Sequence, residues 1–143
     1  MNSFFLIISL HIIKLGTYFL TTETNYDFQG TLTSEAFIVD GSGWITIKIG
    51  GNKTDNLYVS LMKYVDDSED IELAKFNNNL FSDPYRSFAM TKYAYQIPEE
   101  YFGDILYFVI NDYATSDTPF GAITIDEIIT YYEVGNEPPR RWC

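Results

Sequence analysis

Residues 44–49 read Trp-Ile-Thr-Ile-Lys-Ile and alternate without interruption between isoleucine and other side chains. In an extended chain the three isoleucines fall on one face, and Trp44, Thr46 and Lys48 fall on the other. A Gly-rich loop follows, and residues 57–61 then alternate in the same way. Two neighbouring segments therefore predict strands with one buried and one more exposed face.

The same organisation extends in both directions from this pair. Short runs rich in β-branched and aromatic residues are separated by turn residues, and no helical period is sustained over ten residues. We count roughly eight strands and no crossover helices, which disfavours a parallel βαβ fold. The sequence therefore predicts an all-β, antiparallel two-sheet β-sandwich.

Several local features refine this prediction. Residues 105–110 are apolar on both faces, which predicts a central strand buried on each side. The apolar period slips at Asp126-Glu127, which predicts a β-bulge in the last strand. Residues 98–103 begin with Pro and end with Gly, as expected of one helical turn. Residues 77–85 and 111–120 are the two longest irregular loops that we expect.

Composition limits the function. The 143 residues are one domain's length, and a formal net charge of −11 disfavours nucleic acid as a partner. The single cysteine, Cys143, allows no disulfide within the chain and no Cys-rich zinc site. The single histidine, His11, lies in an apolar run, which is a poor position for a nucleophile–histidine relay.

The first residues of the chain stand apart from the rest. Residues 1–14 are apolar but have no preceding basic region and no Ala-x-Ala-like cleavage site. They fit a degenerate signal or membrane anchor, a first strand, or a start codon inside a longer reading frame. We therefore expect a module over 15–132 and a polar tail or linker over 133–143. Any membrane contact would be made through residues 1–14.

An ordered set of motifs resembles a known type of domain. The motifs are GTYFLTTET (16–24), FQGTLTSEAF (28–37), GSGWITIKIGG (41–51), NLYVSL (56–61), FSDP (81–84), YFGDILYFVIND (101–112) and FGAITIDEI (120–128). In this order they resemble the galactose-binding-like, jelly-roll domains attached to bacterial glycoside hydrolases of the fructan- and sucrose-cleaving family. The resemblance covers about residues 15–132. It implies a non-catalytic accessory module in a secreted or cell-surface enzyme.

A sugar site pairs an aromatic platform with planar polar side chains, because sugars present apolar C–H faces and a rim of hydroxyls. We expect such a site where the two long loops converge. Its candidate residues are Arg86, Asp112, Trp44, Tyr85, Tyr93, Asn77 and Asn111. Two of these have structural alternatives: Arg86 can pair with a carboxylate such as Asp83 or Asp112, and Trp44 can pack in the second sheet or against a neighbouring domain.

A structural Ca²⁺ is a second expectation. The resemblance implies a carboxylate on the last strand, which is Asp126 or Glu127 here, with Asp40 contributing from an early turn. Calcium prefers such oxygen ligands. The alternative is a bulge with solvent-facing carboxylates.

The sequence therefore favours a non-catalytic carbohydrate-binding module. Its expected partners are a glycan, such as a fructan or another bacterial or plant polysaccharide, and a neighbouring catalytic domain. The alternative is a spacer or docking module in a large surface protein, without sugar binding. Carboxylates are abundant but lie mostly in turns, so an acid–nucleophile pair for glycoside hydrolysis is not expected.

Overall fold

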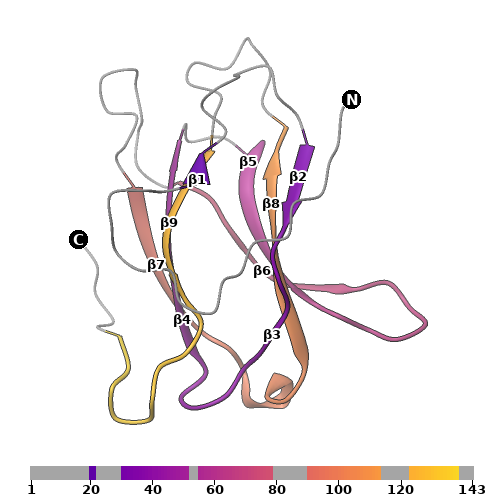
Figure 1. Ribbon diagram of the computed structural model, residues 1–143, viewed down its shortest axis with the longest axis vertical. Coiled ribbons are helices and arrows are strands. Elements are labelled where there is room, and N and C mark those ends of the chain that lie inside the picture. Colours follow the sequence, from indigo (N-terminus) through magenta and orange to yellow (C-terminus); the bar gives the residue numbers. More distant parts are fainter. Residues whose placement is uncertain (1–19, 22–29, 52–54, 79–89, 114–122, 139–143) are drawn as a thin grey trace.

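The computed structural model describes residues 20–21, 30–51, 55–78, 90–113 and 123–138. These residues form two antiparallel sheets, which are drawn side by side in Figure 1. The first sheet has the strand order β1-β9-β4-β7. Its strands are β1 (Leu20–Thr21), β9 (Ile123–Ile129), β4 (Trp44–Gly51) and β7 (Met90–Gln96).

The second sheet has the order β2-β8-β5-β6, with β3 also paired to β8. Its strands are β2 (Gly30–Thr33), β3 (Phe37–Ile38), β8 (Ile105–Asp112), β5 (Leu57–Lys63) and β6 (Ile71–Phe76). The predicted all-β, two-sheet sandwich is confirmed. The described residues contain nine strands rather than roughly eight.

The additional strand arises because the expected strand over 31–39 is divided in two. Ser34 interrupts it: the Ser34 Oγ accepts a hydrogen bond from the Phe108 backbone N–H at 2.8 Å. The Ser34 N–H donates to the Phe108 carbonyl at 2.9 Å. A side-chain oxygen thus replaces a backbone carbonyl in the ladder, and β2 and β3 flank different parts of β8.

The core lies between the sheets and follows the period-2 pattern of the sequence. Ile45, Ile47 and Ile49 are at most 1 % exposed and face the buried side chains of the second sheet, including Phe108. The aromatic rings of Phe37 and Phe108 stack with centroids 5.5 Å apart. The alternation of β4 and β5 therefore places their aliphatic side chains as predicted.

Strand β8 corrects one prediction. It is central, between β2 and β5, but over residues 105–110 it is fully buried on one face only. Leu106, Phe108 and Ile110 face the core, whereas Ile105 is 44 % exposed and Tyr107 is half-buried. A sandwich strand has a second sheet on one side only, so the apolar residues of its other face lie at the surface.

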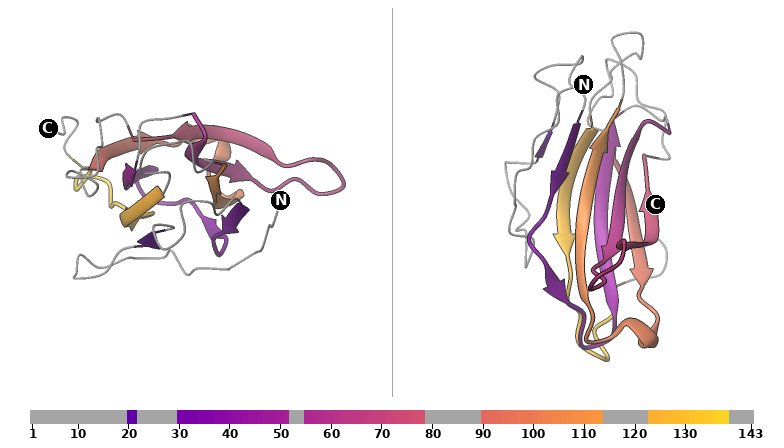
Figure 2. Two further views of the ribbon diagram at one scale, coloured as in Figure 1. Left: turned by 90° about the horizontal axis from the view of Figure 1, so that it is seen from above. Right: turned by 90° about the vertical axis from the view of Figure 1, so that its right-hand side faces the viewer.

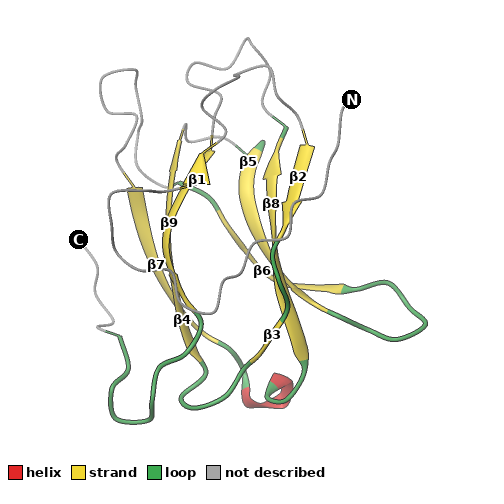
Figure 3. Cartoon of the chain, in the orientation of Figure 1, coloured by secondary structure: helices red, strands yellow, loops and turns green. Residues whose placement is uncertain are grey.

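The predicted bulge in the last strand is confirmed. The pairing of β9 with β4 shifts between Thr46 and Lys48, and Glu127 has a positive φ of 51°. The predicted helical turn also forms, as the 3-10 helix η1 (Glu99–Tyr101), which is drawn in red in Figure 3. Within the described residues, no helix is long and apolar enough to cross a membrane.

The hairpin between β5 and β6 projects from the sandwich. Figures 1 and 2 show this hairpin extending well beyond the other strands of its sheet. Its pairing shifts between Leu61 and Met62, where β6 holds one extra residue. Such a bulge increases the local twist, and the hairpin forms one wall of a groove on the outer face of this sheet.

Candidate functional site

A groove of about 590 Å³ lies on the second sheet and the base of the projecting hairpin. Its volume falls within the range of about 300–1,000 Å³ that is typical of small-molecule sites. The described lining is mainly apolar in area, with hydroxyl groups and one carboxylate. The described lining residues are Thr31, Thr33, Ser34, Ala36, Tyr64, Asp70, Tyr107 and Val109.

The floor of the groove is set by strand alternation. Tyr107 and Val109 lie on the face of β8 opposite the core residue Phe108. Antiparallel register places Thr33 directly beside Val109. One rigid surface therefore holds an aromatic ring, an aliphatic side chain and the hydroxyls of two threonines. It is rigid because the core beneath fixes its strands.

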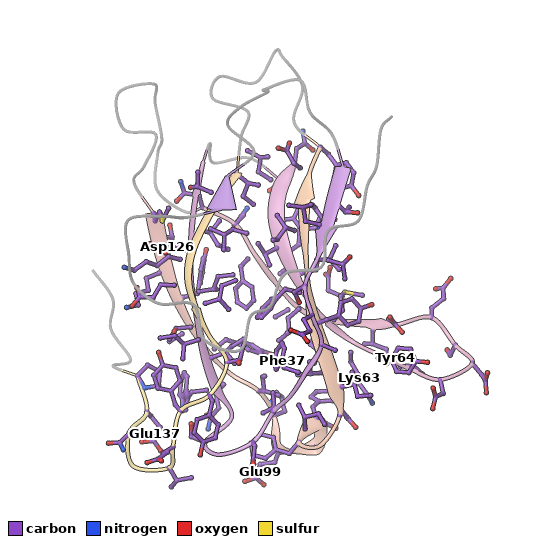
Figure 4. The ribbon with its side chains drawn as sticks, in the orientation of Figure 1. Phe37, Lys63, Tyr64, Glu99, Asp126 and Glu137 are labelled. Atoms are coloured by element: carbon purple, nitrogen blue, oxygen red, sulfur yellow. The ribbon has the colours of Figure 1, made fainter. Side chains whose placement is uncertain are left out.

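The hairpin supplies the wall. Tyr64 follows β5 and is 47 % exposed; Figure 4 labels it at the base of the hairpin. Asp70 precedes β6, and its Oδ1 accepts a hydrogen bond from the Val65 backbone N–H at 3.0 Å. The Tyr107 hydroxyl donates to the other oxygen of Asp70. This bond ties the hairpin to the floor of the groove.

The same hydrogen bond changes the acidity of both groups. The pKa of Asp70 is lowered, first by the Tyr107 hydroxyl and then by the Val65 N–H, because both donors stabilise the carboxylate. The pKa of Tyr107 is raised to about 12 by burial, by the hydrogen bond to Asp70 and by the charge of Asp70. At neutral pH the site therefore holds an ionised carboxylate and a neutral phenol.

The hydrogen bond between Tyr107 and Asp70 should hold the hairpin against the sheet at neutral pH. It should be lost at very low and at very high pH. The lowered pKa of Asp70 adds stability above its unfolded value, and this stability is lost as pH falls through the folded value. The raised pKa of Tyr107 adds stability below its ordinary 10.0, and this is lost as pH rises through about 12. Tyrosine-selective ¹³C NMR should show the Tyr107 ring titrating near pH 12.

Two variants test this assignment. Tyr107→Phe should remove that resonance, and Asp70→Asn should move the Tyr107 titration back toward the ordinary pKa, though not fully, because burial remains. A Tyr107 ring that titrates at the same pH in Asp70→Asn would contradict the coupling between the two groups.

The structure separates the residues predicted for the sugar site. Asp112 ends β8 on the core side, 1 % exposed and in register with Leu57. Trp44 begins β4 in the other sheet, paired with Gln96, at the end opposite that where β8 terminates (Figure 1). Trp44 and Asp112 therefore cannot share one sugar ring. Arg86 and Tyr85, like Asp83, lie outside the described residues.

Tyr93 was expected on an exposed surface but lies on the core side of β7. Its ring contacts Phe76, with centroids 5.3 Å apart, and burial raises its pKa. Its hydroxyl donates to the Asn77 carbonyl at 2.7 Å. Tyr95 also contacts Phe76 from the core side. Both rings therefore serve packing.

Asn111 was expected in a long loop but belongs to β8. It lies on the outer side of that strand yet is only 5 % exposed, and its side-chain amide donates to the Val109 carbonyl at 3.1 Å. Asn77 follows β6 and is half-buried. Neither residue lines the described groove.

The residues predicted for calcium are also apart. Glu127 Oε2 lies 2.6 Å from Lys48 Nζ and 3.7 Å from Lys92 Nζ, so ammonium groups already compensate its charge. The Asp126 carboxylate accepts a hydrogen bond from the Glu127 N–H at 2.8 Å. Asp40 caps its own turn by accepting from the Gly41 N–H at 2.7 Å.

That turn is not beside the bulge. Ser42, in the Asp40 turn, donates to the Tyr132 carbonyl, which lies beyond the end of β9. Tyr132 is about 20 Å of extended chain away from Asp126. Among the described residues, no three acidic, histidine or cysteine side chains gather as a metal site. Calcium stays a prediction of the sequence, and the lysines oppose it at Glu127.

Sequence reasoning missed the groove because it placed the site in loops. The available signal was the pair Tyr107 and Val109 within 105–110, whose side chains alternate with those of the core residues. The acidic hairpin over 66–70 was a second signal, since Asp70 directly precedes β6. Nothing in the sequence alone shows that this hairpin folds over the outer face of the sheet.

No family model matches the chain, and no curated protein matches it.

Proposed function

We propose that this domain is a non-catalytic carbohydrate-binding module that accompanies a glycoside hydrolase, and that the sugar binds in the groove on the outer face of the second sheet. The observation that carries the proposal is the composition of that groove. The rings of Tyr64 and Tyr107 offer apolar faces, and Thr31, Thr33 and Asp70 offer hydrogen-bonding groups around them.

This combination matches the chemistry of a sugar. The C–H faces of a pyranose or furanose ring pack against an aromatic side chain, and its hydroxyls donate to a carboxylate or exchange hydrogen bonds with threonine. The groove is open, so it suits an internal segment of a polysaccharide chain. The resemblance of the sequence motifs to galactose-binding-like modules of fructan-cleaving enzymes supports the same ligand class. It also supports a secreted or cell-surface location.

The absence of catalysis is part of the proposal. Glycoside hydrolysis uses two carboxyl groups about 5–9.5 Å apart, and Asp70 is the single carboxylate of the described groove lining. Its hydrogen bonds from Tyr107 and Val65 keep it ionised, which suits a hydrogen-bond acceptor and not a general acid.

The proposal is tested by affinity electrophoresis of the full chain in gels containing inulin, levan or β-1,4-galactan. We expect retardation in at least one of these polymers. Tyr64→Ala should weaken that binding about tenfold, because truncating an aromatic residue central to a site commonly costs that much or more. Circular dichroism and thermal unfolding would show that the fold is retained.

Tyr131→Ala is the matched control. Tyr131 is 49 % exposed, close to the 47 % of Tyr64, but it follows β9 in the other sheet and does not line the groove. Its replacement should leave binding unchanged. Equal losses in the two variants, or no retardation in any polymer, would overturn the proposal.

One observation favours the alternative, a docking module. Ile38 and Ile105 are paired across β3 and β8, and they are 62 % and 44 % exposed. Two exposed isoleucines side by side are a small apolar patch that a neighbouring domain of the same protein could cover. This alternative predicts no polysaccharide binding, so the same gels distinguish the two functions.

A further inference from the structure

The charged side chains in and beside the described groove are negative. Asp70 is the single charged side chain in its described lining. The tip of the same hairpin carries three more carboxylates, on Asp66, Asp67 and Glu69, and all three residues are exposed. The chain as a whole has a formal net charge of −11. A ligand entering the groove therefore meets negative potential from the wall and from the rest of the domain.

The lysines of the same sheet do not offset this charge at the groove. The Lys63 Nζ lies 3.3 Å from Asp104 Oδ2 and 5.5 Å from the centre of the Tyr101 ring. The Lys75 Nζ lies 4.0 Å from the centre of the Tyr58 ring. Both ammonium groups are engaged by other side chains, and neither lysine lines the described groove.

We infer that the groove selects uncharged glycans and rejects acidic polysaccharides such as polymers of uronic acids. This inference rests on the proposed function and adds the class of sugar to it. A neutral sugar hydroxyl can donate a hydrogen bond to Asp70. A sugar carboxylate in the same place would face a like charge with no cation in the described lining to bridge the two. Asp70 is thus the specificity-determining residue.

The test compares one polymer with its oxidised form. The neutral polysaccharide that retards the wild-type chain (inulin, levan or β-1,4-galactan) is oxidised at its free primary alcohols to carboxylates. Affinities for the two forms are measured at 10 mM and 1 M salt. At 10 mM salt we expect the oxidised form to bind about tenfold more weakly. The repulsion between two carboxylates in a partly screened groove corresponds to a loss of affinity of about this size.

Salt and three variants show whether charge or shape causes the weaker binding of the oxidised polymer. Raising the salt from 10 mM to 1 M shortens the Debye length from about 30 Å to about 3 Å. The difference in affinity between the neutral and the oxidised polymer should therefore become smaller. Asp70→Asn should reduce the difference in affinity between the neutral and the oxidised polymer at 10 mM salt. Asp67→Asn should reduce this difference to a smaller extent, and it removes no hydrogen bond of the hairpin. Glu99→Gln makes the same change in net charge at η1, away from the hairpin (Figure 4), and should leave the difference unchanged.

The outcomes distinguish this inference from the proposed function. If neither polymer binds, the proposed function fails and the inference fails with it. If the oxidised polymer binds as tightly as the neutral one, or more tightly, the function stands and the inference is overturned. A difference in affinity that salt, Asp70→Asn and Asp67→Asn all leave unchanged would also overturn it, because shape and not charge would then cause the weaker binding.

Discussion

Phe108→Ala is expected to lower the free energy of unfolding by about 3–5 kcal/mol, the usual cost of emptying a buried aromatic site. Phe108 is fully buried at the centre of β8, and its ring stacks on Phe37 with centroids 5.5 Å apart. A domain of this size is commonly stable by about 5–15 kcal/mol. The variant should therefore lose a large part of its stability, and urea unfolding would measure the loss as a lower midpoint.

Val109→Ala is the matched control for this prediction. Val109 is the next residue along β8, but it is half-buried on the outer face. Its truncation should cost about 1 kcal/mol or less, because the surrounding surface is open to water. Equal losses in the two variants would contradict the assignment of faces on β8 and, with it, the position of Tyr107 in the groove.

The fold was largely predictable because its core strands carry strict alternation. Ile45, Ile47 and Ile49 have a period of two that no helix shares, so both the strand and its buried face follow from the residues. The bulge at Glu127 was predictable for the same reason, since one extra residue shifts the period of β9 and leaves a trace in the sequence.

The outer face of β8 was not predictable from residue type alone. Ile105, Tyr107 and Val109 are apolar, and an apolar side chain on a solvent-facing groove has the same sequence signature as one in a core. Tyr93 shows the opposite error: a tyrosine on a strand was expected outside, but it packs on Phe76 and satisfies its hydroxyl on the Asn77 carbonyl. Burial of amphipathic residues is decided by tertiary contacts.

The candidate site was hidden for a related reason. Its floor comes from β2 and β8, and its wall comes from a hairpin whose course depends on the register shift between Leu61 and Met62. The bond between Tyr107 and Asp70 joins residues far apart in the chain. Short-range patterns identify strands and turns, but they do not specify which strand faces a given hairpin.

The buried carboxylate at the β9 bulge leads to the second large effect. Glu127 has a side chain that is 8 % exposed and lies within ion-pair distance of two lysines, Lys48 and Lys92, whose side chains are 28 % and 21 % exposed. Replacing one member of a buried ion pair leaves the partner charge poorly solvated, which costs about 3–5 kcal/mol when burial is complete.

We expect Glu127→Gln to destabilise the domain by about 2–3 kcal/mol, less than the full cost because both lysines retain some contact with water. Glutamine keeps the shape of the side chain and the same backbone strain at φ 51°, so the change isolates the charge. Asp126→Asn is the control: Asp126 lies next in the chain and is only half-buried, and asparagine retains the oxygen that accepts from the Glu127 N–H. It should cost about 0.5 kcal/mol or less.

A double-mutant cycle then tests the mechanism. Lys48→Met in the Glu127→Gln background removes one of the two lysines that pair with Glu127 in the wild type, so part of the lost stability should return. The coupling energy from urea unfolding of the four proteins should be about 1–2 kcal/mol, within the range for directly contacting residues. A coupling near zero, or a Glu127→Gln chain as stable as the wild type, would show that the lysines do not depend on this carboxylate.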